Sequence, residues 1–110
     1  MTFIELKDLI EGIGLPCAYY QFEKDTAKPP PFIVWFVSQD NDLLADDRNY
    51  QKIAHIIIEL YTETKDFELE ATVEAHLTEH LSWSRAENFI EDEKLHQTVY
   101  ETEVVIHVEQ

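Results

Sequence analysis

The stretch Ile53-Ala-His-Ile-Ile-Ile-Glu-Leu-Tyr61 decides the fold, because its pattern separates two kinds of secondary structure. Positions 54, 56, 58 and 60 are small or aliphatic, and they alternate with positions that include His55 and Glu59. The run from Tyr50 to Tyr61 is also compatible with a helix. Consecutive β-branched residues favour a strand, since their side chains are restricted at χ1. We therefore predict a strand over residues 50–61.

Further strands are predicted on both sides of this stretch. Phe32 to Val37 is aromatic or β-branched throughout, which is typical of a central strand covered on both faces. From Gln97 to Val108, residues 100, 104, 106 and 108 form an apolar face and residues 101, 103, 107 and 109 a polar one. Shorter strands are expected at 18–22 and 84–90, with a turn at 91–94.

Two helices are predicted from apolar residues at helical spacing. In residues 2–13, Thr2 is a candidate N-cap, and Gly12 and Gly14 end the helix. The second helix begins at Asp66 and carries apolar residues at 69, 73 and 77, with its glutamates at 68, 70, 74 and 79 mostly outward. The order α-β-β-β-α-β-β predicts one α+β domain over residues 1–110, with an antiparallel or mixed sheet of about five strands and two helices packed on it.

Two connections are expected to be irregular. Residues 23–31 are polar and end in three prolines, and we interpret them as a hairpin connection. Ser38 to Asn49 contains four aspartates, two leucines and no periodicity, which predicts a long acidic loop. The aspartates suggest calcium, but the loop lacks the glycine and glutamate that an EF-hand requires. We favour a loop that orders against a protein partner through its two leucines.

Composition and charge limit the classes of function. The chain has 23 acidic and 8 basic residues, a formal net charge of −15, which repels phosphate backbones and anionic membrane surfaces. Such a negative charge favours solubility, the binding of a basic partner, or a surface along which nucleic acid passes without binding. Cys17, the single cysteine, predicts a plain thiol in a reducing compartment. No apolar run or basic N-terminal flank suggests a membrane segment or signal peptide, so we expect a cytoplasmic protein or a particle assembled there.

Candidate catalytic patterns are few. His76-Leu-Thr-Glu79-His80 fits the H-x-x-E-H pattern of a metalloprotease class, but catalytic zinc also needs a third ligand and a cleft. His55, His96 and His107 have no nucleophile at a suggestive spacing, although a meeting in space stays open. The two glycines form no phosphate-binding motif. We therefore expect no enzyme, no cofactor and no resident metal.

Several ordered blocks resemble a family of small prophage proteins. They are Pro29-Pro-Pro-Phe-Ile-Val-Trp35, Ala45-Asp-Asp47, Tyr50-Gln-Lys-Ile53, Ile58-Glu-Leu-Tyr-Thr62, Lys65-Asp66, Leu69-Glu70, Ile90-Glu-Asp-Glu-Lys-Leu95 and Val99-Tyr-Glu101. The family is encoded in the head–tail module of siphophages that infect Gram-positive bacteria, and its members are thought to be tail-completion or tail-terminator proteins. The resemblance spans about residues 16–104. It includes no catalytic motif.

The resemblance implies a fold like the tail terminators of lambda-type phages. Such subunits form a hexameric ring between the tail tube, made of the major tail protein, and the head–tail connector, so the expected location is the virion. DNA would pass through the ring without specific binding. On this hypothesis the contact residues are Asp40, Asp42, Leu43, Leu44, Asp46, Asp47, Pro29, Pro30, Glu101 and Glu103. The alternative is an acidic adaptor or DNA mimic that binds a basic host protein.

Overall fold

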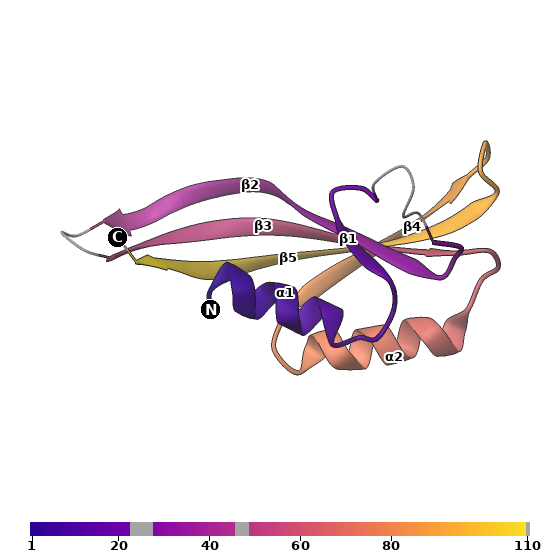
Figure 1. The fold of residues 1–110 in the computed structure, drawn as a ribbon, viewed down its shortest axis with the longest axis horizontal. Coiled ribbons are helices and arrows are strands. Elements are labelled where there is room, and N and C mark those ends of the chain that lie inside the picture. The colour runs from indigo at the N-terminus through magenta and orange to yellow at the C-terminus, as the bar shows by residue number, and fades with distance from the viewer. Residues whose placement is uncertain (23–27, 46–48, 110) are drawn as a thin grey trace.

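The computed structural model describes residues 1–22, 28–45 and 49–109, and confirms the predicted α+β fold and order of elements (Figure 1). The elements are α1 (Phe3–Glu11), β1 (Cys17–Tyr19), β2 (Phe32–Ala45), β3 (Asn49–Thr62), α2 (Phe67–Thr78), β4 (Trp83–Ile90) and β5 (Leu95–Glu109). No helix in these residues is long and apolar enough to cross a membrane.

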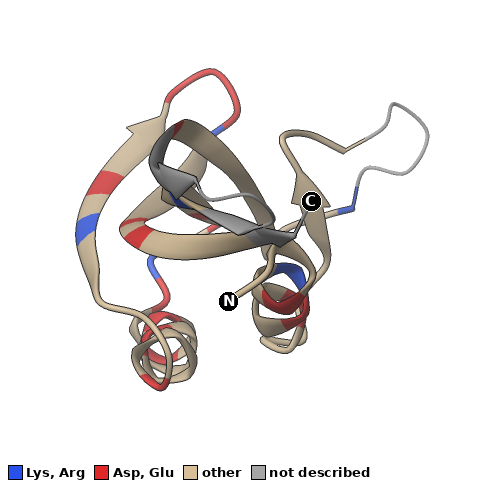
Figure 2. Cartoon of the chain, turned by 90° about the vertical axis from the view of Figure 1, so that its left-hand side faces the viewer, with Lys and Arg blue, Asp and Glu red and all other residues tan. Residues whose placement is uncertain are grey.

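The strands form one mixed sheet in the order β1-β2-β3-β5-β4. β1 runs parallel to β2, and every other neighbouring pair is antiparallel. β2, β3 and β5 are the long strands, and they extend well beyond β1 and β4 toward one end of the molecule (Figure 1). Both helices pack on the same face of the sheet, so the opposite face is covered by neither helix (Figures 1 and 2).

The predicted alternation in β3 is confirmed. Ala54, Ile56 and Ile58 are fully buried and Leu60 is 1% exposed, whereas the residues between them are only half-buried. β5 alternates in the same way, with Tyr100 and Ile106 buried and Glu101 exposed. The helix-side core comprises Leu6, Ile10, Ile33, Trp35, Ala54, Ile56, Ile58, Leu60, Val73, Leu77, Leu81, Tyr100, Val104 and Ile106.

The prediction for the start of the sheet was partly wrong. The strand expected at 18–22 is Cys17–Tyr19, and it pairs with β2 in parallel rather than as a hairpin. Tyr20 donates its backbone N–H to the carbonyl of Trp35 at 2.8 Å, and its φ of 73° then turns the chain away from β2. Residues 28–31 therefore belong to a crossover, and residues 23–27 lie outside the described residues.

The prediction of a long loop from Ser38 to Asn49 was wrong. β2 continues to Ala45 and β3 begins at Asn49, and residues 46–48 lie outside the described residues. The sequence hides this strand because two irregularities in register, at Val37/Gln39 and Asp42/Leu44, break the two-residue period. The strand forms because β3, which itself pairs with β5 as far as Asn49, provides backbone hydrogen-bond partners for this part of β2.

Local signals set the helix starts as expected. Thr2 and Glu5 form a capping box at α1, and the Asp66 side chain accepts a hydrogen bond from the Leu69 amide at α2. One glutamate of α2 departs from the outward orientation that we predicted for most of them. Glu70 is only 3% exposed, because it shares the buried face of the helix with Val73 and Leu77.

Candidate functional site

The predicted contact residues lie in three separate places. Asp40, Asp42, Leu43 and Leu44 belong to the long part of β2, whereas Asp46 and Asp47 lie outside the described residues. Pro29 is exposed and Pro30 half-buried, near the opposite end of β2. Pro30 lines a hollow of about 180 Å³ with residues 31, 62–64 and 66. Glu101 and Glu103 lie on the face of the sheet that the helices leave uncovered.

The uncovered face, as we call it, combines apolar and acidic residues. The register places Ile53, His55, Ile57, Glu59 and Tyr61 of β3 beside the open-side residues of β5, which include Val99, Glu101, Glu103 and Val105. Val105 is 42% exposed, and no lysine or arginine is among the described strand residues of this face. The face is therefore partly apolar, and apart from its histidines all of its described charged side chains are acidic.

Glu101 and Glu103 line a hollow of about 430 Å³ together with His55, Ser82, Trp83, Ser84 and Thr102. His55 Nε2 lies 2.5 Å from Glu103 Oε1, and both side chains are exposed to solvent. His55 and hydroxyl residues therefore lie around the same hollow, a possibility that the sequence could not exclude. Among the described residues no hydrogen bond joins the Ser84 hydroxyl to His55, so the nucleophile–base contact of hydrolases is missing from this hollow.

Tyr61 also belongs to this face. Its hydroxyl donates to Glu59 Oε1 at 3.1 Å and accepts from Gln97 Nε2 at 2.7 Å, and its ring stacks on Phe32 with centroids 5.0 Å apart. Partial burial raises the pKa of Tyr61 to about 12, against the opposing effect of the Gln97 hydrogen bond. The folded state therefore keeps the phenol protonated at a pH where an unfolded tyrosine ionises.

This pKa predicts a loss of stability in alkali. Between pH 10 and 12 the unfolded chain gives up the Tyr61 proton and the folded chain keeps it, so the free energy of unfolding falls as pH rises through this window. Tyr61→Phe should flatten the fall relative to the parent protein. Denaturant unfolding at intervals from pH 9 to 12 measures the slope, and Tyr20→Phe, at an exposed tyrosine, is the control. An unchanged slope in Tyr61→Phe contradicts the assignment.

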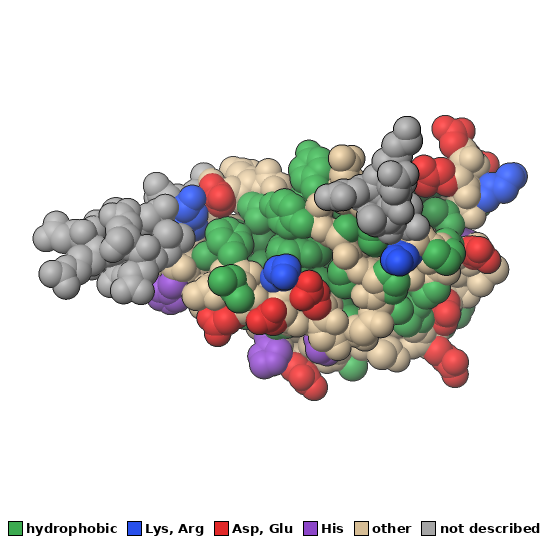
Figure 3. All heavy atoms as spheres, viewed as in Figure 1, with side chains coloured by type: hydrophobic (Ala, Val, Ile, Leu, Met, Phe, Trp, Pro, Cys, Tyr) green, Lys and Arg blue, Asp and Glu red, His purple; other side chains and the backbone are tan. Residues whose placement is uncertain are grey.

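A second hollow, of about 510 Å³, lies along the outer edge of β2. We call it the α1–β2 groove; it is lined by Phe3, Ile4, Lys7, Glu11, Cys17, Ala18, Tyr19, Trp35, Val37 and Asp40. Figure 3 views this side of the molecule, where hydrophobic side chains gather between α1 and β2. The charged groups of the groove are paired: Lys7 lies 3.4 Å from Glu11, and Lys52 lies 3.9 Å from Asp40.

The Cys17 thiol in this groove is half-buried, and it donates to the Leu15 carbonyl at 3.2 Å. Burial, with a smaller contribution from Glu11, raises its pKa. A raised pKa lowers the fraction of thiolate, which is the reactive form. Cys17 is therefore a packing residue of the groove.

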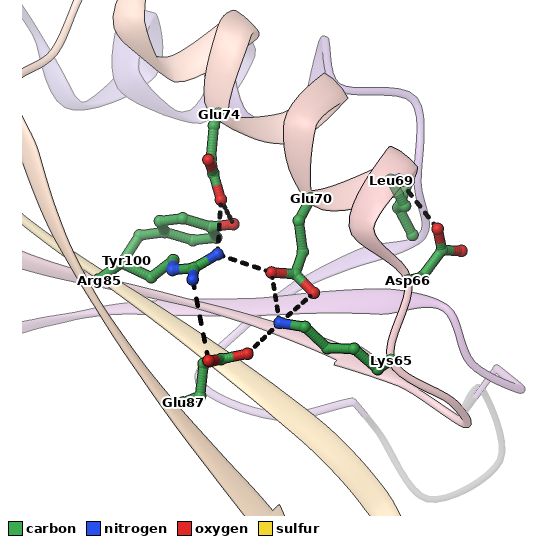
Figure 4. Close-up of polar contacts among 8 residues, drawn as sticks. All are labelled: Lys65, Asp66, Leu69, Glu70, Glu74, Arg85, Glu87 and Tyr100. Carbon is green, nitrogen blue, oxygen red and sulfur yellow. Dashed lines mark hydrogen bonds and ion pairs between the residues drawn. The ribbon is translucent and has the colours of Figure 1, made fainter.

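The opposite edge of the sheet, β4, is bound to α2 by the ionic network in Figure 4. Glu70 accepts from Lys65 Nζ and from Arg85 Nη1, each at 2.8 Å, and Glu87 on β4 also pairs with Lys65. Glu74 accepts from the Tyr100 hydroxyl at 2.8 Å and approaches Arg85 at 3.3 Å. The hydrogen bonds to Glu70 and Glu87 raise the pKa of Lys65, and the hydrogen bond from Lys65 lowers the pKa of Glu87.

Neither the network nor the groove was foreseen from the sequence, although one signal for the network was present. Glu70 precedes Val73 by three residues and Leu77 by seven, which is the spacing of the buried face of α2. A carboxylate at such a position needs a cation. The groove had no comparable signal, because α1, β1 and β2 form it together.

The H-x-x-E-H pattern does not form a metal-binding helix face. α2 ends at Thr78, so Glu79 and His80 lie beyond its last turn. His76 Nε2 lies 2.6 Å from the Leu9 carbonyl oxygen, and this bond requires a protonated Nε2 that ties α2 to α1. Throughout the described residues, no three His, Cys, Asp or Glu side chains are arranged to hold a metal ion.

Charges are distributed unevenly over these surfaces. The described lysines and arginines that form ion pairs belong to two groups. Lys7 on α1 and Lys52 on β3 pair with Glu11 and Asp40 of the α1–β2 groove, and Lys65, which precedes α2, and Arg85 on β4 pair with the glutamates of the network in Figure 4. Carboxylates without an ion pair among the described residues include Glu101 and those of the β4–β5 turn, Glu91, Asp92 and Glu93, which appear as a red loop in Figure 2. The carboxylates of the α1–β2 groove and of the network are therefore paired with cations, whereas the uncovered face and the β4–β5 turn carry unpaired negative charge.

Comparison of the chain with protein-family models and with curated proteins found no match to either.

Proposed function

We propose that this chain is a structural subunit of a phage tail, which completes or terminates the tail and joins it to the head–tail connector. In this proposal the subunits form a hexameric ring around the DNA channel and contact the major tail protein. The ring forms part of the virion and is assembled in the bacterial cytoplasm. DNA passes through it without specific binding, and the chain itself acts neither as an enzyme nor as a membrane protein.

The charge layout is the observation that carries this proposal. A chain with a net charge of −15 associates with copies of itself only where charge is compensated, because like charges across an interface cost several kcal/mol. The α1–β2 groove beside β2 and the β4–α2 network meet this condition, since their carboxylates are paired with lysine or arginine. The unpaired carboxylates on the uncovered face and the β4–β5 turn remain available to repel DNA phosphates.

The same layout is unfavourable to the alternative of a DNA mimic. A mimic of the phosphate backbone requires regularly spaced carboxylates on a convex surface. The carboxylates of the uncovered face, Glu59, Glu101 and Glu103, are instead interspersed with Ile57 and with half-buried or exposed valines. Apolar area among the charges suits contact with protein better than imitation of DNA.

The test combines solution mass with electron microscopy of tails. We expect the protein to add to the open end of tail tubes that lack their terminator, as a ring of subunits, and to restore head attachment. Ovalbumin, which is also acidic, serves as the control for non-specific adsorption. A protein that stays monomeric at high concentration and also fails to add to the tubes contradicts the proposal. A monomer that adds to the tubes is consistent with it, since rings of this kind can assemble on the tube.

A further inference from the structure

The two edges of the sheet are unlike and both are incompletely paired. On one side β1 covers only Ile33–Trp35 of β2, so no described strand pairs with the outer side of residues 36–45. On the other side β4 has β5 as its only neighbour among the described strands, so no described strand pairs with the outer side of its 8 residues. Unpaired edges of this length are sites where another strand can add.

Exposed apolar side chains concentrate at the same two edges. Among the described residues the large exposed ones are Ile4, Tyr19, Tyr20, Phe67, Phe89 and Val105. The first three border the free part of β2. Phe89 lies on β4, and Phe67 lies beneath Lys65, whose ammonium pairs with Glu87 of β4. Val105 lies on the part of β5 that continues past its pairing with β4, which ends at Thr102. The other five lie beside the free part of β2 or beside β4, so each of these two regions combines apolar surface with paired charges.

We propose that copies of this chain associate edge to edge, with β4 of one copy pairing with the free part of β2 of the next and packing against its α1–β2 groove. This inference rests on the proposed ring and specifies how its subunits join. The charges favour a second copy of the chain as the binding partner. The chain as a whole is strongly acidic, but the carboxylates of both surfaces are paired with cations. Pairing of two unlike edges is a heterologous contact, which closes into a ring when the rotation allows it.

Strand directions agree with this contact. β2 to β3, β3 to β5 and β5 to β4 are each antiparallel steps, so β4 runs opposite to β2. In a ring whose copies share one orientation, β4 therefore meets the next β2 in the antiparallel sense. The free part of β2 lies beside residues 50–57 of β3. β4 lies beside residues 95–102 of β5, and residues 96–102 of that stretch pair with residues 56–62 of β3. This offset tilts the strands relative to the ring axis, as in barrels.

Tyr19 occupies part of the position that the incoming strand would take. Its hydroxyl accepts a hydrogen bond from the outward-facing backbone N–H of Val37 at 3.2 Å, although its side chain is 51% exposed. An added strand would replace this hydroxyl with a backbone carbonyl. Tyr19→Phe, which removes the competing acceptor, should therefore raise edge association by about two- to tenfold. Tyr20→Phe is the matched control, since its hydroxyl has no hydrogen-bond partner in the described part of the chain.

Disulfide cross-linking tests the contact directly. In a Cys17→Ser background, Gln39→Cys on β2 is combined in turn with Ser84→Cys, Ala86→Cys or Asn88→Cys on β4, because all four positions face the uncovered side. Two strands separate the paired positions within one copy, so a bond forms only between copies. At least one combination should give products at successive multiples of the subunit mass. Each single cysteine should give dimers at most, and Gln39→Cys with Thr72→Cys, at an exposed position on α2, should give no such series.

The oxidation is run in solution and on protein bound to tail tubes that lack their terminator. The series of products supports the edge contact, and its increase in Tyr19→Phe but not in Tyr20→Phe supports the role of the Val37 amide. Protein that binds the tubes or forms rings but gives no series overturns the edge contact and leaves the proposed function standing. Protein that remains monomeric and does not bind the tubes overturns both.

Discussion

Ile58→Ala is expected to lower the free energy of unfolding by about 3 kcal/mol, the middle of the range for aliphatic residues truncated in a packed core. Ile58 is fully buried at the centre of β3, between Trp35 on β2 and Tyr100 on β5. The loss combines reduced apolar burial with the cavity that its neighbours leave open. Urea unfolding followed by tryptophan fluorescence measures it.

The adjacent Ile57 is a matched control for this prediction. It is the same residue type in the same strand, but its side chain is half-buried on the uncovered face. Ile57→Ala should lower the free energy of unfolding by no more than about 1 kcal/mol, since only part of its surface leaves water on folding. Equal losses in the two variants contradict the assignment of the two faces.

Glu70→Ala is expected to lower the free energy of unfolding by about 2–4 kcal/mol. Removing one partner from a buried ionic contact leaves the remaining charges uncompensated, and such changes cost about 3–5 kcal/mol when burial is complete. The Glu70 side chain is 4% exposed, but those of Lys65 and Arg85 are 25% and 35% exposed, so water recovers part of the loss. Thermal and urea unfolding at neutral pH measure the effect.

Glu68→Ala controls for the loss of a carboxylate in the first turn of α2, because Glu68 lies on the exposed side of the same helix. It should change the free energy of unfolding by about 0.5 kcal/mol or less. Glu70→Ala should also loosen β4, which is bound to α2 through Arg85 and Glu87, and so reduce the cross-linking yield on β4. Stability equal to that of Glu68→Ala contradicts the structural role of Glu70.

The candidate site was harder to predict than the fold, and for a physical reason. A binding edge depends on which strand has no neighbour, and this is a property of the complete sheet. Glu101 and Glu103 could be assigned to a solvent-facing side because their strand alternates regularly. That His55 meets Glu103 depends on the register between β3 and β5, and the groove beside Tyr19 depends on where α1 docks.

Local and periodic signals alone determined the α+β class, the order of the elements, the starts of both helices and the buried side of residues 54–60. These features depend on side chains a few residues apart, so the chain encodes them wherever its neighbours lie. The strand from Ser38 to Ala45, the parallel pairing of β1, the burial of Glu70 and the two open edges were decided by the tertiary structure. Each depends on a partner distant in sequence: β3 for β2, β2 for β1, and Lys65 with Arg85 for Glu70. Backbone hydrogen bonds and ion pairs of this kind exist only after the sheet and its helices have assembled.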